Sequence, residues 1–171
     1  AIAQAELEDS EKESEFYYLK FSVPSIKKDI TIATTRPEFL PACVAIFVNP
    51  DDVRYKEFIG KRAKLPLVNR DAPIIASRDA NPEKGTGAVY VCTFGDYEDA
   101  IWVKGANLPI IQILSPDGRL NEKAGKYAGL KLKEAREKIV ADLKSAGAFV
   151  KEEKIKNVVN VHERCGTPVE F

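Results

Sequence analysis

Short apolar runs separated by turn residues dominate the chain, and they predict a protein built mainly from β-strands. Aromatic and β-branched residues fill 16–23 and 29–35, and a lysine-containing turn after Pro24 joins the two segments, so we expect a hairpin. Further apolar runs bounded by Gly, Pro, Asn or Asp predict strands at 43–50, 63–68, 72–77, 87–94 and 108–114. One more strand and a turn are expected at 156–171. Several short strands of this kind favour a barrel or a sandwich.

Helical periodicity is confined to two segments of the chain. In 130–147 one face is apolar and the opposite face is charged, and Gly147 follows as a C-cap. The members of the apolar face are Leu132, Ala135, Ile139, Val140 and Leu143. The segment 96–107 predicts a shorter helix with Asp96 as its N-cap. Together the patterns indicate an α+β fold, with a β-barrel core and flanking helices.

Composition narrows the possible classes of function. The 171 residues include 26 Lys plus Arg and 26 Asp plus Glu, so any nucleic-acid contact must come from a local patch. The three cysteines are widely spaced and form no C-x-x-C pair, which argues against disulfides and structural zinc and favours the cytoplasm. No apolar run approaches the roughly 18 residues that span a bilayer, so no membrane partner is expected. The chain lacks methionine, and we interpret 1–171 as one domain excised from a longer protein, with removal of an initiator methionine as the alternative.

The stretch Gly85–Asp99, "GTGAVYVCTFGDYED", is the first candidate for chemistry. It lacks the third glycine of a dinucleotide fingerprint and the Gly-Lys-Ser/Thr of a phosphate loop, so both nucleotide interpretations fail. What remains is a glycine turn and an apolar strand that deliver Asp96 and Asp99 to the start of a helix. One carboxylate can cap the helix while the other faces a pocket. Alternatively, both are first-turn acids favoured by the helix dipole.

The second candidate is the stretch "TTRPEFLPAC", residues 34–43. Arginine after a β-branched strand is usually a surface residue whose stem lies on apolar neighbours. Here Pro37 restricts Arg36 to extended geometry, so the backbone sets the direction of its side chain. A directed guanidinium beside two hydroxyls suits an anionic or ester oxygen. A ligand site and a surface position both remain open for Arg36.

The two stretches together resemble a known family. "TIATTRPEFLPACVAIFVNPDD" and "GTGAVYVCTFGDYEDA" are similar to the editing domain inserted in the class I aminoacyl-tRNA synthetases for valine, isoleucine and leucine. Thr-Thr-Arg-Pro-Glu points to the valine enzyme, and "LPAC" and "VCTFGD" resemble its archaeal form. The resemblance covers nearly all of the chain. The opening "AIAQAELED" and the closing "ERCGTPVEF" resemble the strands that join the insertion to its host.

The resemblance implies hydrolysis of threonine wrongly attached to the tRNA for valine. A valine pocket cannot strongly reject the nearly isosteric threonine, a limit for which the valine enzyme is a known example, and a second hydrolytic site remedies it. The implied partners are the 3′ end of a mischarged tRNA and the rest of the parent synthetase, with no cofactor and no metal. By resemblance, Asp99 holds the α-ammonium group, while Arg36 and Thr35 orient the reacting ester. Substrate-binding positions implied in the same way are Thr34, Glu38, Asp96, Lys84, Tyr90, Cys92 and Thr93.

The sequence departs from the pattern of the family at several of these positions. Phe39 stands where many valine enzymes have threonine, and Lys84 where bacterial relatives commonly have phenylalanine. Lysine cannot stack a base but can contact phosphate. Tyr90 and Cys92 replace a lysine and a threonine of the bacterial enzymes. Two alternatives stay open: the isoleucine-enzyme domain, which edits valine, and a non-catalytic β-barrel binding module.

Overall fold

The computed structural model describes residues 11–92, 108–109 and 111–158 of the chain. The strands are β1 (Glu11–Val23), β2 (Lys28–Thr34), β3 (Cys43–Val48), β4 (Arg62–Lys64), β5 (Asp71–Ala76), β6 (Ala88–Cys92) and β7 (Phe149–Val158). The helices are α3 (Leu132–Ser145) and the short 3-10 helices η1 (Pro24–Ile26), η2 (Pro37–Ala42), η3 (Val53–Phe58) and η4 (Glu122–Tyr127). None of these helices is long and apolar enough to cross a membrane.

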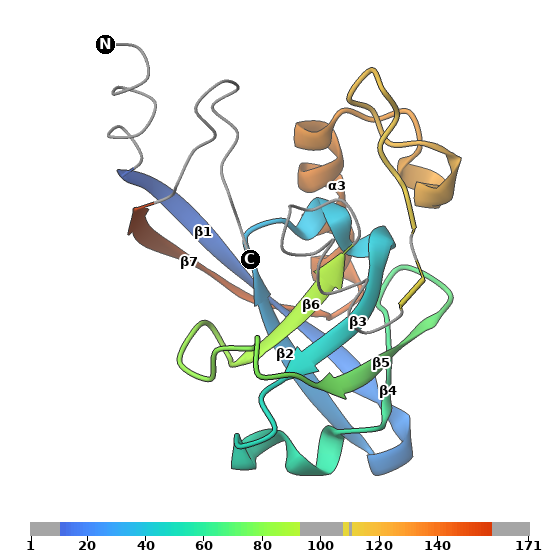
Figure 1. Cartoon of the computed structure of the whole chain (residues 1–171). Coiled ribbons are helices and arrows are strands. Elements are labelled where there is room, and N and C mark those ends of the chain that lie inside the picture. The colour runs from blue at the N-terminus through green and yellow to red at the C-terminus, as the bar shows by residue number, and fades with distance from the viewer. Residues whose placement is uncertain (1–10, 93–107, 110, 159–171) are drawn as a thin grey trace.

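The seven strands form one mixed sheet that curls on itself. Their order is β2-β1-β4-β5-β3-β6, and β7 pairs with β1 outside this path. Only β3 and β5 run parallel to each other among these pairs. The outermost strands of the order, β2 and β6, also contact each other, so the sheet is nearly closed (Figure 1). The predicted α+β fold with a β-barrel core is therefore confirmed.

The predicted hairpin near the start of the chain is present as β1 and β2. The two strands are antiparallel, with Tyr17 opposite Thr34 and Val23 opposite Lys28. Along β1, Leu19 and Phe21 are fully buried while Lys20 is exposed. This alternation is the period-two pattern of a strand with one face on a core.

Strand β3 is buried at all six positions because both of its faces are covered. Cys43, Ile46 and Val48 pack into the main core of the barrel. Val44, Ala45 and Phe47 join a second apolar cluster on the outer side. A run of consecutive apolar residues is the expected signature of a strand enclosed in this way.

Helix α3 matches its predicted segment closely. It spans Leu132–Ser145, and its buried residues are Ala135, Ile139 and Leu143, which recur every four positions. Gly147 follows the C-cap with a φ of 74°, the left-handed conformation that glycine adopts without a β-carbon penalty. The helix packs against η2 and β7, which brings it to the segment that follows the Thr34 strand end.

Other predicted elements differ from the structure. The strand expected at 63–68 ends at Lys64, because Pro66 and a left-handed Leu67, with a φ of 66°, turn the chain. The described part of 108–114 forms no strand and contributes one isolated bridge, from Leu114 to Leu120. The predicted helix at 96–107 and the chain beyond Val158 lie outside the described residues.

The pairing of β1 with β7 was not expected from the sequence. The two strands pair from Glu11 opposite Val158 to Leu19 opposite Phe149, and they extend beyond the barrel as a two-stranded ribbon (Figure 1). Strand β7 therefore begins well before the strand predicted at 156. Its charged residues lack the clear alternation that identifies a half-buried strand.

Candidate functional site

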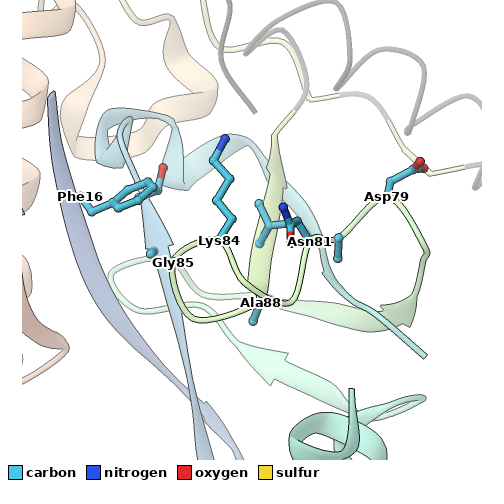
Figure 2. A pocket seen from close by; sticks show the side chains of 11 residues that line it. Phe16, Asp79, Asn81, Lys84, Gly85 and Ala88 are labelled. Carbon is cyan, nitrogen blue, oxygen red and sulfur yellow. The ribbon is translucent and has the colours of Figure 1, made fainter. Parts of the chain in front are cut away.

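A hollow of about 230 Å³ lies where the loop before β6 crosses the end of β2. Residues from β1, β2, β6 and the loop line it: Phe16, Ala33, Thr34, Asp79, Ala80, Asn81, Lys84, Gly85, Gly87, Ala88 and Val89. Figure 2 shows Phe16 and Lys84 on one side of this hollow, with Asn81 and Asp79 toward the other. An aromatic ring, an ammonium group and polar side chains thus surround one space.

Gly85 allows the loop to lie directly on β2. A β-carbon on residue 85 would come within 2.7 Å of the Cβ of Ala33, and the φ of Gly85 is +58°. Both facts require glycine at this position. The next residue, Thr86, donates a hydrogen bond from Oγ1 to the backbone oxygen of Thr31 at 2.6 Å. The loop is therefore fixed to β2 beside the hollow.

Side chains also fix the end of β2, where Thr34 leads into Arg36. The Oγ1 atom of Thr34 accepts a hydrogen bond from the backbone N–H of Arg36 at 2.9 Å. The hydroxyl of Tyr90, on β6, donates to the backbone oxygen of Arg36. Burial raises the pKa of Tyr90 well above its ordinary value, which keeps this hydroxyl protonated and able to donate. The Arg36 turn is thus held from β2 and from β6.

Phe39 gives the Arg36 side chain a defined direction. The guanidinium carbon of Arg36 lies 5.1 Å from the centre of the Phe39 ring, within the range of a cation–π contact. Phe39 itself is 2% exposed. Phe39 therefore acts as an aromatic platform for the arginine.

Glu38 points away from the hollow and into the protein. It is 2% exposed, and its two carboxylate oxygens accept hydrogen bonds from Nε and Nη2 of Arg136 at 2.9 and 2.7 Å. Arg136 lies on α3, so the ion pair joins η2 to this helix. Through this ion pair, Glu38 holds the segment that follows Arg36 against α3.

The structure brings together some of the predicted site residues. Thr34 and Lys84 line the same hollow, although they are 50 positions apart, and the half-buried Thr35 and Arg36 continue directly from Thr34. Tyr90 is buried behind the Arg36 turn. Cys92 is also buried, at 4% exposure, opposite Cys43 across the β3–β6 pair. The predicted residues Thr93, Asp96 and Asp99 lie outside the described part of the chain.

Among the residues of the hollow that were not predicted from the sequence, three have an aromatic or polar side chain: Phe16, Asp79 and Asn81. Phe16 has the appearance of an ordinary strand aromatic, and Asp79 and Asn81 have that of ordinary turn residues. No local signal could have selected them, because the hollow exists only once the loop is placed on β2. Within 11–92, 108–109 and 111–158, no three His, Cys, Asp or Glu side chains are grouped to hold a metal ion.

The chain matches no family model, but it is similar to known proteins over its full length. A valine–tRNA ligase of Pyrococcus horikoshii is 51% identical over 174 aligned residues, which cover 100% of this chain and 20% of that ligase. The valine–tRNA ligase of Methanocaldococcus jannaschii is also 51% identical, over 171 residues, with the same coverage. This chain thus spans about one fifth of the length of these curated relatives.

Comparison with solved structures agrees on the fold. A chain from Agrobacterium radiobacter, in a ternary complex described as LeuRS-tRNA-LeuAMS, superposes with a TM-score of 0.67 at 20% sequence identity. The match covers 93% of this chain and 24% of that one. At this identity the likeness concerns the fold alone. The whole chain is therefore homologous to a segment of archaeal valine–tRNA ligases, and it has the editing-domain fold of the aminoacyl-tRNA synthetases.

Proposed function

We propose that the chain is a proofreading hydrolase that removes threonine from tRNA(Val). Its substrate is the 3′ end of the mischarged tRNA, and the rest of the parent synthetase presents that end to it in the cytoplasm. The observation that carries the proposal is the shared hollow of Thr34 and Lys84, beside the fixed Arg36 turn, in a chain homologous over its full length to archaeal valine–tRNA ligases.

The described residues suit the end of an aminoacylated tRNA. The hollow of about 230 Å³ offers the ring of Phe16 and the ammonium group of Lys84, which suit a flat base and a phosphate respectively. Next to it, the Arg36 guanidinium and the Thr35 hydroxyl provide hydrogen-bond donors for ester and ribose oxygens. These donors are arranged before substrate arrives, which lowers the cost of orienting the ester.

Asp99 completes the proposed site. Strand β6 ends at Cys92, only seven positions before Asp99, and its Tyr90 hydroxyl already contacts the Arg36 turn. Seven residues reach at most about 25 Å when fully extended, so Asp99 is within range of the same turn. In the proposal its carboxylate binds the α-ammonium group of threonine, and Asp96 and Thr93 support this contact.

The reaction in this proposal is ester hydrolysis by water. Water adds to the carbonyl carbon of the threonyl ester, and the bond from that carbon to the ribose oxygen breaks. The ribose oxygen takes up the proton, so that free threonine and uncharged tRNA leave. We propose that backbone groups and the neighbouring ribose hydroxyl position the water, and that Arg36 stabilises the negative charge that develops on the carbonyl oxygen.

Deacylation of defined mischarged tRNAs tests the proposal. The chain is incubated with threonyl-tRNA(Val) and with valyl-tRNA(Ile), and the loss of radiolabelled amino acid is followed. We expect faster loss of threonine, and Asp99→Ala should lower that rate by about 100-fold because the ester is no longer oriented. Arg36→Ala should lower the rate by about 100-fold as well, if it stabilises the developing oxyanion. Arg62→Ala, an exposed arginine on β4, is the matched control and should leave the rate unchanged.

Each contrary outcome identifies a different function. Faster release of valine from tRNA(Ile) would assign the chain to editing in the isoleucine system. Unchanged deacylation in Asp99→Ala, with the fold intact by circular dichroism, would place the chemistry elsewhere. Binding of the tRNA end without any deacylation would indicate a non-catalytic binding module.

A further inference from the structure

The helix η3 holds the loop beside the hollow at two points. Arg54 donates from Nη2 to the backbone oxygen of Pro82 at 2.8 Å, and the Tyr55 hydroxyl donates to the backbone oxygen of Thr86. We call residues 81–87 the site loop. Lys84, whose side chain lines the hollow, stands midway between these two anchors. Neither Arg54 nor Tyr55 lines the hollow itself.

Asp52 in turn fixes the side chain of Arg54. Its two carboxylate oxygens accept hydrogen bonds from Arg54 Nε at 2.9 Å and Nη2 at 2.7 Å, and its Oδ1 also accepts from the Arg54 backbone N–H at 3.1 Å. The Asp52 side chain is 4% exposed. A bidentate pair of this kind sets the plane of the guanidinium group, so the contact with Pro82 has a defined geometry.

The site loop is enclosed between η3 and β2. On the β2 side, Gly85 lies against Ala33 and Thr86 bonds to Thr31. On the η3 side, Gly87 approaches Arg54 so closely that a β-carbon would lie 2.6 Å from Nη2. Within the loop, the Lys84 backbone N–H donates to Asn81 and the Gly87 N–H donates to Lys84. The backbone at Lys84 is therefore constrained from both sides.

We propose that Arg54 and Tyr55 are positioning residues for the site, which act by holding Lys84 in the hollow. They contact no substrate in this account. Their effect on activity rests on the proposed function, whereas their effect on the site loop does not. Loosening either anchor should weaken substrate binding, and this loss should depend on the presence of Lys84.

Trypsin provides a readout of the loop that is independent of activity. The bond between Lys84 and Gly85 is a trypsin site inside the anchored segment. The test compares the rate at which trypsin cleaves this bond, measured by mass spectrometry. The chains to compare are the wild type, Arg54→Ala, Arg54→Lys, Tyr55→Phe and the control Arg62→Ala. Losing one anchoring hydrogen bond should speed cleavage by about three- to tenfold in Arg54→Ala and Tyr55→Phe. Lysine lacks the planar fork, so Arg54→Lys should behave as Arg54→Ala does.

Deacylation kinetics supply the second readout. Arg54→Ala and Tyr55→Phe should raise KM for threonyl-tRNA(Val) by about three- to tenfold with little change in kcat, as the loss of a binding contact predicts. In a Lys84→Ala background, Arg54→Ala should add less than about twofold, because residues that act through one another are not additive.

The outcomes separate the two proposals. Cleavage and KM values equal to those of Arg62→Ala would overturn the positioning role, and so would a full additional loss from Arg54→Ala in the Lys84→Ala background. If the wild-type chain deacylates neither tRNA, the proposed function fails. The cleavage rate at Lys84–Gly85 then still decides whether η3 holds the loop.

Discussion

Glu38 and Arg136 are 98 positions apart in the chain and form a two-point ion pair, with donor–acceptor distances of 2.9 and 2.7 Å. Glu38 is almost fully buried, while 40% of the Arg136 side chain is exposed. The pair fastens η2, which begins directly after Arg36, to helix α3. The direction of Arg36 is thus coupled to helix α3, although no residue of α3 lines the hollow.

Arg136→Ala should destabilise the fold markedly. It leaves the buried Glu38 carboxylate without its partner, which we expect to cost about 2–3 kcal/mol, less than for a fully buried pair because water reaches Arg136. Urea denaturation measures the change. Arg78→Ala is the control, since its pair with Asp51 is exposed on both sides and should contribute less than about 1 kcal/mol. Equal losses in the two variants would contradict the role of the buried pair.

Gly85→Ala should displace the site loop from β2. The substitution forces alanine into a left-handed conformation and drives its β-carbon into Ala33, for a combined cost of about 2–3 kcal/mol. Urea denaturation gives the loss of stability, and binding of an adenosine-terminated RNA end gives the effect on the hollow. In an Ala33→Gly background the clash is absent, so the same substitution should cost about 1–2 kcal/mol, the conformational part alone. An identical cost in both backgrounds would show that contact with Ala33 is unimportant.

Tyr90→Phe should loosen the Arg36 turn while preserving the core. It removes the hydroxyl that donates to the Arg36 backbone oxygen and retains the ring, so we expect about 1–2 kcal/mol of lost stability. Deacylation should fall together with stability because the direction of Arg36 depends on that carbonyl. Tyr18→Phe retains a half-buried ring that lies under Lys151, and it serves as the control. A normal deacylation rate in Tyr90→Phe would show that activity does not depend on the hydrogen bond from Tyr90 to the Arg36 turn.

Lys84→Ala should reduce the salt dependence of substrate binding. If Lys84 contacts one phosphate of a single-stranded 3′ end, its loss should lower the slope of log affinity against log salt concentration by about 0.7. Fluorescence anisotropy with a labelled RNA end across a salt series measures this slope. Lys61→Ala, an exposed lysine outside the hollow, should leave the slope as it is in the wild-type chain. An unchanged slope in Lys84→Ala would argue against the phosphate contact.

The pair of Tyr127 and Asp142 makes stability depend on pH at both extremes. Tyr127 donates to Asp142 Oδ2 at 2.6 Å and Lys126 approaches the same atom at 3.1 Å, which together lower the pKa of Asp142. This contribution is present above the unfolded pKa, about 3.9, and is lost as the pH falls through the lower folded value. Burial and then Asp142 raise the pKa of Tyr127, so its contribution is lost as the pH rises above about 10.

Two variants separate these effects in urea denaturation across a pH series. Asp142→Asn should flatten the acid side of the stability profile, because its amide does not titrate. Tyr127→Phe should flatten the alkaline side, because phenylalanine does not titrate either. Each variant also weakens the other shift, so neither profile should match that of the wild-type chain. Unaltered slopes at both ends would show that these groups do not control the pH dependence.

Some elements could be predicted from the pattern of their own residues alone. The aromatic and β-branched residues of 16–23 and 29–35 specified the β1–β2 hairpin, and the apolar face of 130–147 specified α3 and its glycine end. The family resemblance implied that Thr34 and Lys84 bind the same substrate, and the two residues line one hollow, although their role in binding stays a prediction. In each case the information is a periodicity or a short string of residues, which the chain carries without reference to distant segments.

Only the tertiary structure decided the relationships between distant segments. The β1–β7 ribbon pairs the polar start of β1 with β7, whose residues show no clear strand pattern alone, so β7 is recognised as a strand only beside its partner. Glu38 meets Arg136 only because α3 packs against η2, and Phe16 lines the hollow only because the loop lies on β2. Such contacts depend on which surfaces meet in space. The sequence by itself determined the β1–β2 hairpin, helix α3 and the residue types available to the candidate site; the tertiary structure decided which side chains line the hollow and which hold it in shape.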